Sequence, residues 1–207
     1  MPLDASLRPN PRNFFIASTA LLFLSFPTLA QENGLHIRNA GAAECSRVSS
    51  IYGAAGSETD KAAILNWIAG YTNAQSEAQG IIDIFPLVDS EELVQMVVLV
   101  CGENPSVRLQ NATKTTIERL RPLWIIKNAA ITRIDDGTGV TRMFSAAIRP
   151  LQRLLTDKGI SISIDGQYGP QTGEAIQAIM ASLGLQAIKR PNGIILYTIT
   201  LPDPQTE

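Results

Sequence analysis

Residues 151–185 read LQRLLTDKGISISIDGQYGPQTGEAIQAIMASLGL, and this stretch decides how the C-terminal part of the chain folds. An apolar stripe predicts a helix over 141–158, which ends at Gly159 because glycine readily adopts the left-handed conformation of a C′ residue. Thr172 has the side chain of an N-cap and predicts a second helix over 173–183. A helix, a turn and a second helix in this order predict one compact, mostly helical unit.

The turn between these helices carries glycines, an aromatic residue and a threonine at a fixed spacing. In order along the chain they are Asp165, Gly166, Tyr168, Gly169 and Thr172. This pattern resembles the turn of the peptidoglycan-binding domain (PGBD-1-like) family, and the resemblance covers 144–201. It implies a small three-helix domain that binds the stem peptide or the glycan of peptidoglycan noncovalently. Residues 194–199 are rich in β-branched side chains, so a strand there is the alternative to the family's short third helix.

Three side chains of this unit are candidates for peptidoglycan binding. Arg149 and Arg153 are one turn apart on the predicted helix and therefore share a face. Arginine binds carboxylates bidentately, and a stem peptide offers carboxylates. Tyr168 can cover methyl groups or a sugar ring. The alternative for the two arginines is a solvated helix face, and for Tyr168 a place in the core.

Residues 1–30 have the features of a secretory signal. Arg8 and Arg12 precede the apolar run 14–26, and small residues stand at the −3 and −1 positions of the expected cleavage point. The alternative is an uncleaved membrane anchor. We expect cleavage, which makes 31–207 a periplasmic protein with no membrane association.

An export signal on a chain with two cysteines, Cys45 and Cys101, predicts a disulfide. The alternative is a pair of buried free thiols. Residues 31–122 read as helices, so we expect a helical bundle that the disulfide closes. Its central helix should begin with a capping box, in which Asp89 is the N-cap and Glu92 the N3 residue. This helix should be the most buried, because it is apolar most of the way round. The predicted starts and ends of helices are, in chain order, Ser57 with Asp60, Gly80, Asp89 with Glu92, and Pro105.

Trp67 and Tyr71 lie between the two cysteines in a pattern similar to small exported helical proteins. These are the HdeA-like acid-stress chaperones and the Rap1a/Tai immunity-like proteins. The similarity implies contact between residues 31–122 and a periplasmic protein partner. Chaperone members expose apolar surface when acid neutralises their carboxylates. The alternative for Trp67 and Tyr71 is a purely structural place in the core.

Residues 123–140 read as a linker with one short strand over 130–134, and 141–207 as the peptidoglycan-binding-like domain. We expect no enzyme and no cofactor, because the one histidine, His36, cannot build a metal site of several converging ligands. A glycosidase could work with two carboxylates alone, and Glu91 with Glu118 is that alternative. Nucleic acid is not an expected partner, because no dense basic run with interleaved aromatic residues occurs. The predicted fold class is mainly α: a disulfide-closed bundle followed by three small helices.

Overall fold

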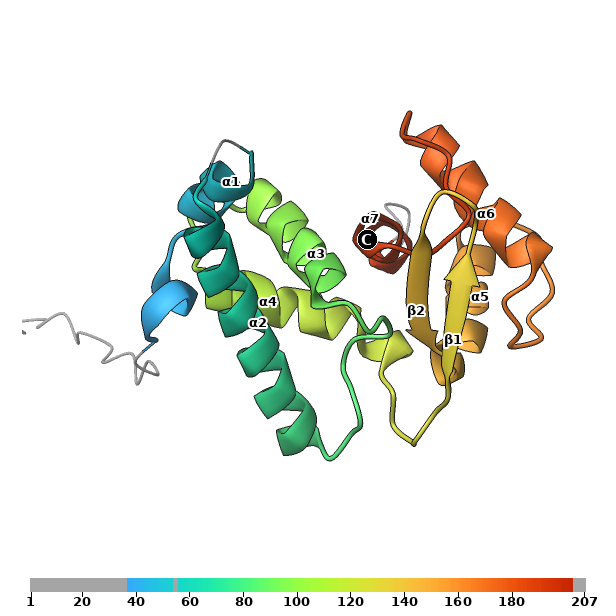
Figure 1. Cartoon of the computed structure of the whole chain (residues 1–207), viewed down its shortest axis with the longest axis horizontal. Helices are drawn as coiled ribbons and strands as arrows, with labels where there is room; N and C mark the ends of the chain where they lie inside the picture. The colour runs from blue at the N-terminus through green and yellow to red at the C-terminus, as the bar shows by residue number, and fades with distance from the viewer. Residues whose placement is uncertain (1–36, 54–55, 203–207) are drawn as a thin grey trace, which may run out of the picture. The chain divides into compact units, whose positions relative to one another are not determined.

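Residues 37–53 and 56–202 are described by the computed structural model, and they form helices with one small sheet (Figure 1). The predicted signal segment, 1–30, and His36 lie outside the described residues. The elements, in chain order, are η1 (Asn39–Ala42), α1 (Cys45–Gly53), α2 (Glu58–Gln79), α3 (Ser90–Glu103), α4 (Leu109–Arg119), η2 (Arg121–Leu123), β1 (Ile131–Asp135), β2 (Val140–Phe144), η3 (Ser145–Ala147), α5 (Ile148–Asp157), α6 (Pro170–Ser182) and α7 (Gly193–Thr200). The mainly α class is confirmed.

The predicted disulfide is confirmed. Cys45 at the start of α1 is bonded to Cys101 near the end of α3, and both residues are fully buried. The bond joins two helices that also pack directly on each other. It therefore cross-links the core of the bundle rather than its surface.

Helix α2 begins and ends where the sequence predicts. The Ser57 hydroxyl oxygen accepts a hydrogen bond from the Asp60 N–H at 3.1 Å, and Gly80 takes the left-handed conformation with φ 65°. Trp67 and Tyr71 are half-buried and stack with ring centroids 5.1 Å apart. Both aromatic rings therefore pack along the side of the helix.

Helix α3 is the central element, as its apolar sequence predicts. It packs on α1, α2, α4 and α7. Its N-terminus differs from the predicted capping box. Asp89 is the N-cap residue, yet its carboxylate pairs with Arg142 instead of capping the helix. Glu92 accepts a hydrogen bond from the Gly193 N–H at 2.7 Å. Tertiary partners have thus replaced the local bonds.

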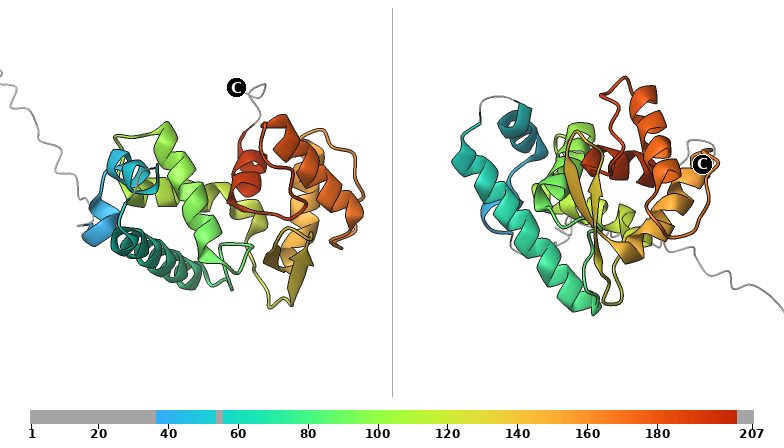
Figure 2. Two further views of the ribbon diagram at one scale, coloured as in Figure 1. Left: turned by 45° about the horizontal axis from the view of Figure 1, so that its top comes forward. Right: turned by 45° about the vertical axis from the view of Figure 1, so that its right-hand side comes forward.

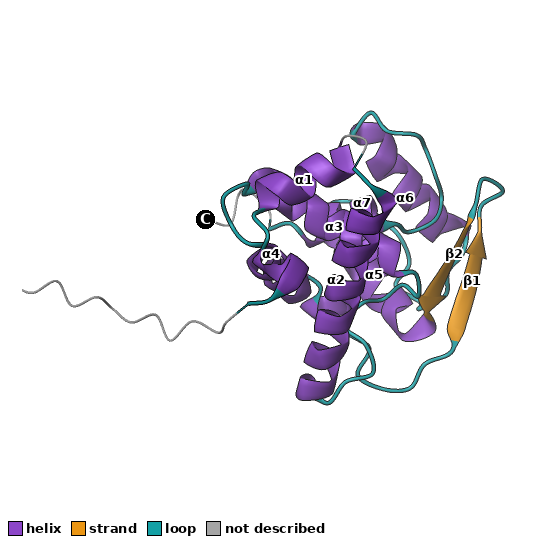
Figure 3. Ribbon diagram, turned by 60° about the vertical axis from the view of Figure 1, so that its left-hand side comes forward, coloured by secondary structure: helices purple, strands orange, loops and turns teal. Residues whose placement is uncertain are grey.

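The predicted helix over 141–158 is wrong in its first half. Residues 140–144 form strand β2, because their side chains alternate between exposed and buried, with Thr141 and Met143 buried. The helix itself, α5, begins only at Ile148. The predicted strand over 130–134 is confirmed one residue later as β1, and the strands form an antiparallel hairpin beside the helices (Figure 3).

The hairpin is joined to the N-terminal helices through the loop before α3. The Val88 N–H donates to the Arg142 carbonyl at 2.9 Å, and the Phe144 N–H donates to the Pro86 carbonyl at 3.0 Å. Leu123 and Ile125, in the predicted linker, are fully buried. The described residues all belong to one unit, His36–Glu207, and the predicted domain boundaries at 122 and 141 fall inside it.

Residues 194–199 form helix α7, so the alternative of a strand there is wrong. The Asn192 side chain caps the helix by accepting from the Ile195 N–H at 2.9 Å. Helix α7 packs on α3, α5 and α6, and Figure 2 shows the red α7 between the green and the orange helices. A Cβ atom at Gly193 would lie 2.3 Å from the Glu92 carbonyl oxygen. Glycine therefore lets α7 approach α3, and burial outweighs the low helix propensity of the β-branched residues.

Two further helix starts are corrected. Helix α6 has Gly169 as its N-cap and Pro170 at its first position, so Thr172 lies inside the helix and does not cap it. Helix α4 begins at Leu109 and not at Pro105. Proline fits the first turn because its missing N–H would have no partner there, and this preference decides the start of α6.

Candidate functional site

Gln152 of α5 organises the turn that the sequence singled out. This side chain is 1% exposed. Its Nε2 donates to the Asp165 carboxylate at 2.8 Å and to the Gln167 carbonyl at 3.0 Å, and it lies 3.2 Å from the Thr172 hydroxyl. Its Oε1 accepts from the Gly166 N–H at 2.8 Å. One buried amide therefore fixes the turn to α5 and to the first turn of α6.

Arg149 holds the same turn from outside. Its Nη1 and Nη2 donate to the carbonyl oxygens of Ile164 and Asp165, each at 2.7 Å. The guanidinium group thus spends two of its N–H groups on the protein itself. Arg153 is exposed, and the described residues contain no hydrogen-bond or ion-pair partner for it. Of the two predicted binding arginines, Arg153 has the free side chain.

The carboxylate of Asp165 is held in its ionised form. Its pKa is lowered below the ordinary value, mainly by the hydrogen bond from the Gln167 N–H and next by the one from the Gln152 side chain. Gly166 follows with φ 79°, a conformation that favours glycine. The Asp-Gly pair therefore builds a rigid turn, and its carboxylate is already occupied by the protein.

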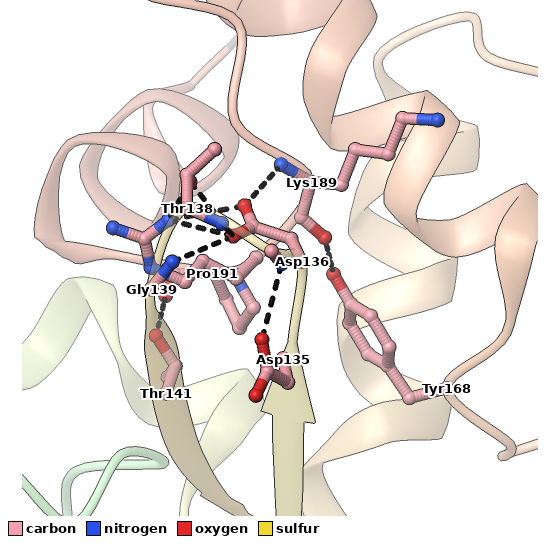
Figure 4. Close-up of polar contacts among 10 residues, drawn as sticks. Asp135, Asp136, Thr138, Gly139, Thr141, Tyr168, Lys189 and Pro191 are labelled. Atoms are coloured by element: carbon pink, nitrogen blue, oxygen red, sulfur yellow. Dashed lines mark hydrogen bonds and ion pairs between the residues drawn. The ribbon is translucent and has the colours of Figure 1, made fainter.

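Tyr168, the third predicted binding residue, is half-buried beside this turn. Its hydroxyl donates to the Lys189 carbonyl (Figure 4). Burial, and then the negative charge of Asp136, raise the pKa of the Tyr168 hydroxyl, so it remains a proton donor. Tyr168 lines two clefts and can therefore contribute to either of them.

A buried carboxylate at the β1–β2 turn anchors the loop before α7. The Asp136 side chain is 3% exposed and lies 3.0 Å from the Arg190 guanidinium group. It also accepts from the Lys189 N–H at 2.9 Å and from the Thr138 hydroxyl at 2.7 Å (Figure 4). Burial alone would raise the pKa of Asp136, but the bonds from Lys189, Thr138 and Arg190 together lower it.

We expect Asp136→Asn to lower the free energy of unfolding by about 2 kcal/mol at pH 7, because charge-assisted hydrogen bonds are lost. The pKa of Asp136 is lower in the folded chain than its ordinary 3.8. Its stabilising contribution is therefore present above about pH 4 and is lost as the pH falls below that value. Urea unfolding from about pH 5 to about pH 2 should thus show a shallower pH dependence in the variant.

The matched control is Asp157→Asn, since Asp157 is exposed on the last turn of α5. This variant should retain the pH profile of the parent protein. Parallel profiles for the parent and Asp136→Asn would contradict the role given to Asp136.

Two open clefts flank Tyr168. The motif cleft has a volume of about 380 Å³, and its lining is polar. It includes Gln152, Asp165, Gln167, Tyr168 and Gln171. The strand cleft has a volume of about 410 Å³ and lies between β1 and the start of α6. It includes Arg133, Asp135, Asp136, Tyr168, Pro170 and Lys189. Both volumes are in the range of small-ligand sites.

The motif cleft offers amides, one aromatic ring and an occupied carboxylate, which suit binding by hydrogen bonds.

No group of three or more His, Cys, Asp or Glu side chains within 37–53 and 56–202 could hold a metal ion. No helix in that part of the chain is long and apolar enough to cross a membrane. Glu118, one of the two carboxylates considered for glycoside hydrolysis, pairs with Arg121 at 2.6 Å.

Sequence reasoning missed the roles of Gln152 and Asp136. A signal for Gln152 existed, because it is a polar residue between Leu151 and Leu155 on the apolar stripe of α5. Such a position predicts a buried group with several hydrogen bonds. The sequence carries no comparable signal for Asp136, whose partner Arg190 is 54 residues away.

Comparisons of the chain with protein-family models, with curated proteins and with solved structures found no match.

Proposed function

We propose that the chain is an exported protein that binds peptidoglycan noncovalently in the motif cleft and has no catalytic role. The observation that carries this proposal is the fixation of the turn at 163–172 by Gln152 and Arg149. A cleft whose polar groups are already ordered loses little conformational entropy when a ligand binds. Its chemistry also matches a stem peptide, which presents amides, carboxylates and methyl groups.

Each part of the ligand has a matching group at the motif cleft. Gln167 is exposed at its rim and can exchange hydrogen bonds with peptide amides. The Oε1 of Gln171, also exposed there, already accepts from the Ser163 N–H at 3.3 Å, so this side chain has its Nε2 to donate to a ligand. The ring of Tyr168 offers an apolar surface for methyl groups or for a sugar face. Arg153 has a free guanidinium group on the exposed face of the neighbouring α5, where it can attract a carboxylate. Arg149 contributes indirectly, since its N–H groups hold the turn.

Co-sedimentation of the chain 31–207 with purified peptidoglycan sacculi tests this function. We expect the parent protein to pellet with the wall and to be released in part by salt, because salt screens exposed charges. Arg153→Ala should weaken the apparent affinity about fivefold, which corresponds to about 1 kcal/mol. Tyr168→Phe should bind like the parent if only the ring face contacts the ligand.

The matched control is Arg108→Ala, because Arg108 is equally exposed and lies before α4, in the bundle. Its affinity for sacculi should equal that of the parent. Failure of the parent protein to pellet, or equal losses in Arg108→Ala and Arg153→Ala, would refute binding through the motif cleft.

An acid-responsive chaperone is the second candidate, and the carboxylates at α3 favour it. Asp89 pairs with Arg142, Glu92 accepts from the Gly193 N–H, and Glu103 accepts from the hydroxyl of Tyr197. Each bond joins α3 or its N-cap to the C-terminal elements. Loss of these bonds would weaken the contact between α3 and α7 and would expose the apolar residues of α7.

This second function predicts that the protein suppresses aggregation only in acid. Light scattering of an acid-unfolded model client should fall in the presence of the chain at about pH 3 and remain unchanged at about pH 7, where carboxylates are ionised. Glu92→Gln, which keeps the size of the side chain but removes its charge, should shift the onset of protection to higher pH. Equal protection at both pH values would contradict the idea.

A further inference from the structure

One edge of the β1–β2 hairpin has no partner strand among the described residues. The Ser145 N–H donates to the Ala130 carbonyl, and the Asp136 N–H donates to the Gly139 carbonyl. These two bonds flank the hairpin ladder and fix which residues face β2. Hydrogen-bonded pairs alternate along an antiparallel ladder, so the backbone N–H and C=O groups of Thr132 and Ile134 point toward β2.

The N–H and C=O groups of Ile131, Arg133 and Asp135 therefore point away from β2. No other backbone group in 37–53 and 56–202 bonds to them. The opposite edge of the hairpin is covered, since Arg142 and Phe144 bond to the loop before α3. The free edge offers three donors and three acceptors over a length of about 17 Å, at about 3.4 Å per residue.

The strand cleft follows this edge. All residues from Thr132 to Asp136 line one of its walls, and Tyr168, Gly169 and Pro170 line the other. Its volume of about 410 Å³ leaves room for a single extended chain of a few residues. The free edge therefore borders a space that is already shaped as a groove.

The charges of the strand cleft favour an acidic ligand. The carboxylates of Asp135 and Asp136 are occupied by Arg133 and Arg190, respectively, and by backbone N–H groups. The Lys189 ammonium group has no partner among the described residues, and Figure 4 shows this side chain extending away from the Asp136 cluster. One positive charge thus remains uncompensated beside the groove.

We propose that the strand cleft binds an extended, acidic segment of a protein partner, which adds as a third strand to the free edge of β1. Main-chain bonds to Ile131, Arg133 and Asp135 would hold the segment, as in other cases of strand addition. An acidic side chain would face Lys189. Ile131 is 54% exposed and offers a cross-strand contact to an apolar residue.

Two other occupants fit this edge less well. If β1 paired with β1 of a second copy about a two-fold axis through Arg133, two arginines would face each other, which is unfavourable. A second hairpin would also need more room than a single strand. A wall stem peptide alternates L and D residues, whereas the right-handed twist of β1 suits a segment of L residues.

The test begins with an array of seven-residue peptides on which the chain 31–207 is the probe. The peptides carry Val, Ile or Thr at positions 2, 4 and 6, and Glu, Lys or Gln at the others. We expect the bound peptides to contain Glu and not Lys. In ¹⁵N-labelled protein, the best binder should slow amide exchange of Ile131, Arg133 and Asp135 at least tenfold, while Thr132 and Ile134 should not change.

Variants separate the backbone bonds from the side chains. Arg133→Pro removes one outward N–H without touching the ladder to β2, and should weaken peptide binding at least tenfold. Arg133→Ala retains that N–H and should stay within about threefold of the parent, because an exposed ion pair contributes little; it removes the same ion pair with Asp135 as Arg133→Pro does, so the difference between the two variants measures the N–H. Lys189→Gln should abolish the preference for Glu over Lys. Peptides that are N-methylated at alternate residues lose backbone N–H donors on the ligand side. Their binding to the parent protein tests the same main-chain bonds without a change in the protein.

Three outcomes would overturn the proposal. One is an array without bound peptides, and another is binding that is indifferent to the position of the N-methyl group. The third is a soluble muropeptide that produces the same alternating protection, which would assign the strand cleft to the wall. Binding to sacculi through the motif cleft depends on Arg153 and not on Arg133, so failure of one site does not imply failure of the other.

Discussion

Replacing Cys45 and Cys101 together by alanine is expected to lower the free energy of unfolding by about 4 kcal/mol, because the unfolded chain gains the entropy of an open loop. The two cysteines are separated by 56 positions. The long loop makes this the largest single change that we expect. For a protein of this size the melting temperature should fall by about 10 °C.

Reduction of the parent protein separates the cross-link from the packing of the sulfur atoms. Both cysteines are fully buried, so alanine also removes buried atoms next to α1 and α3. Reduced parent protein retains those atoms, and its melting temperature should lie between those of the oxidised parent and the double variant. Reductant should leave the double variant unchanged. A melt that is the same with and without reductant would show that the bond does not stabilise the fold.

Gln152→Met is expected to lower the free energy of unfolding by about 3 kcal/mol, because buried polar groups lose their partners. Methionine has a similar length and volume, so packing in α5 is maintained. The Gly166 N–H loses its acceptor, and Asp165 loses its bond from the Gln152 amide. The turn that shapes the motif cleft should therefore loosen as well.

Gln186→Met is the matched control, because it makes the same chemical change at an exposed position whose side chain has no hydrogen-bond partner among the described residues. Its effect on stability should stay within about 0.5 kcal/mol, as for most surface substitutions. Chemical denaturation measures both variants. Equal losses would mean that burial of Gln152 does not matter. Binding of the Gln152 variant to sacculi should fall even under conditions in which it remains folded.

The sequence predicted the local features of this protein well. Ser57 and Gly80 mark the ends of α2 because a capping hydroxyl and a left-handed glycine act within one turn of the chain. The apolar surface around α3 predicted its central place. Two cysteines behind a predicted export signal predicted the Cys45–Cys101 bond. These features depend on residues near in sequence, or on a pairing with only one solution.

Tertiary structure decided the features that depend on distant partners. Residues 194–199 have strand propensity, but packing on α3 makes them helical. Residues 141–144 were predicted as the start of a helix, but pairing with β1 makes them part of a strand. In the candidate site, the sequence named Arg149, Arg153 and Tyr168, whereas the fold assigned Arg149 to the turn and brought Asp136 to Arg190. Local propensities differ by less than about 1 kcal/mol per residue, so burial and long-range bonds outweigh them.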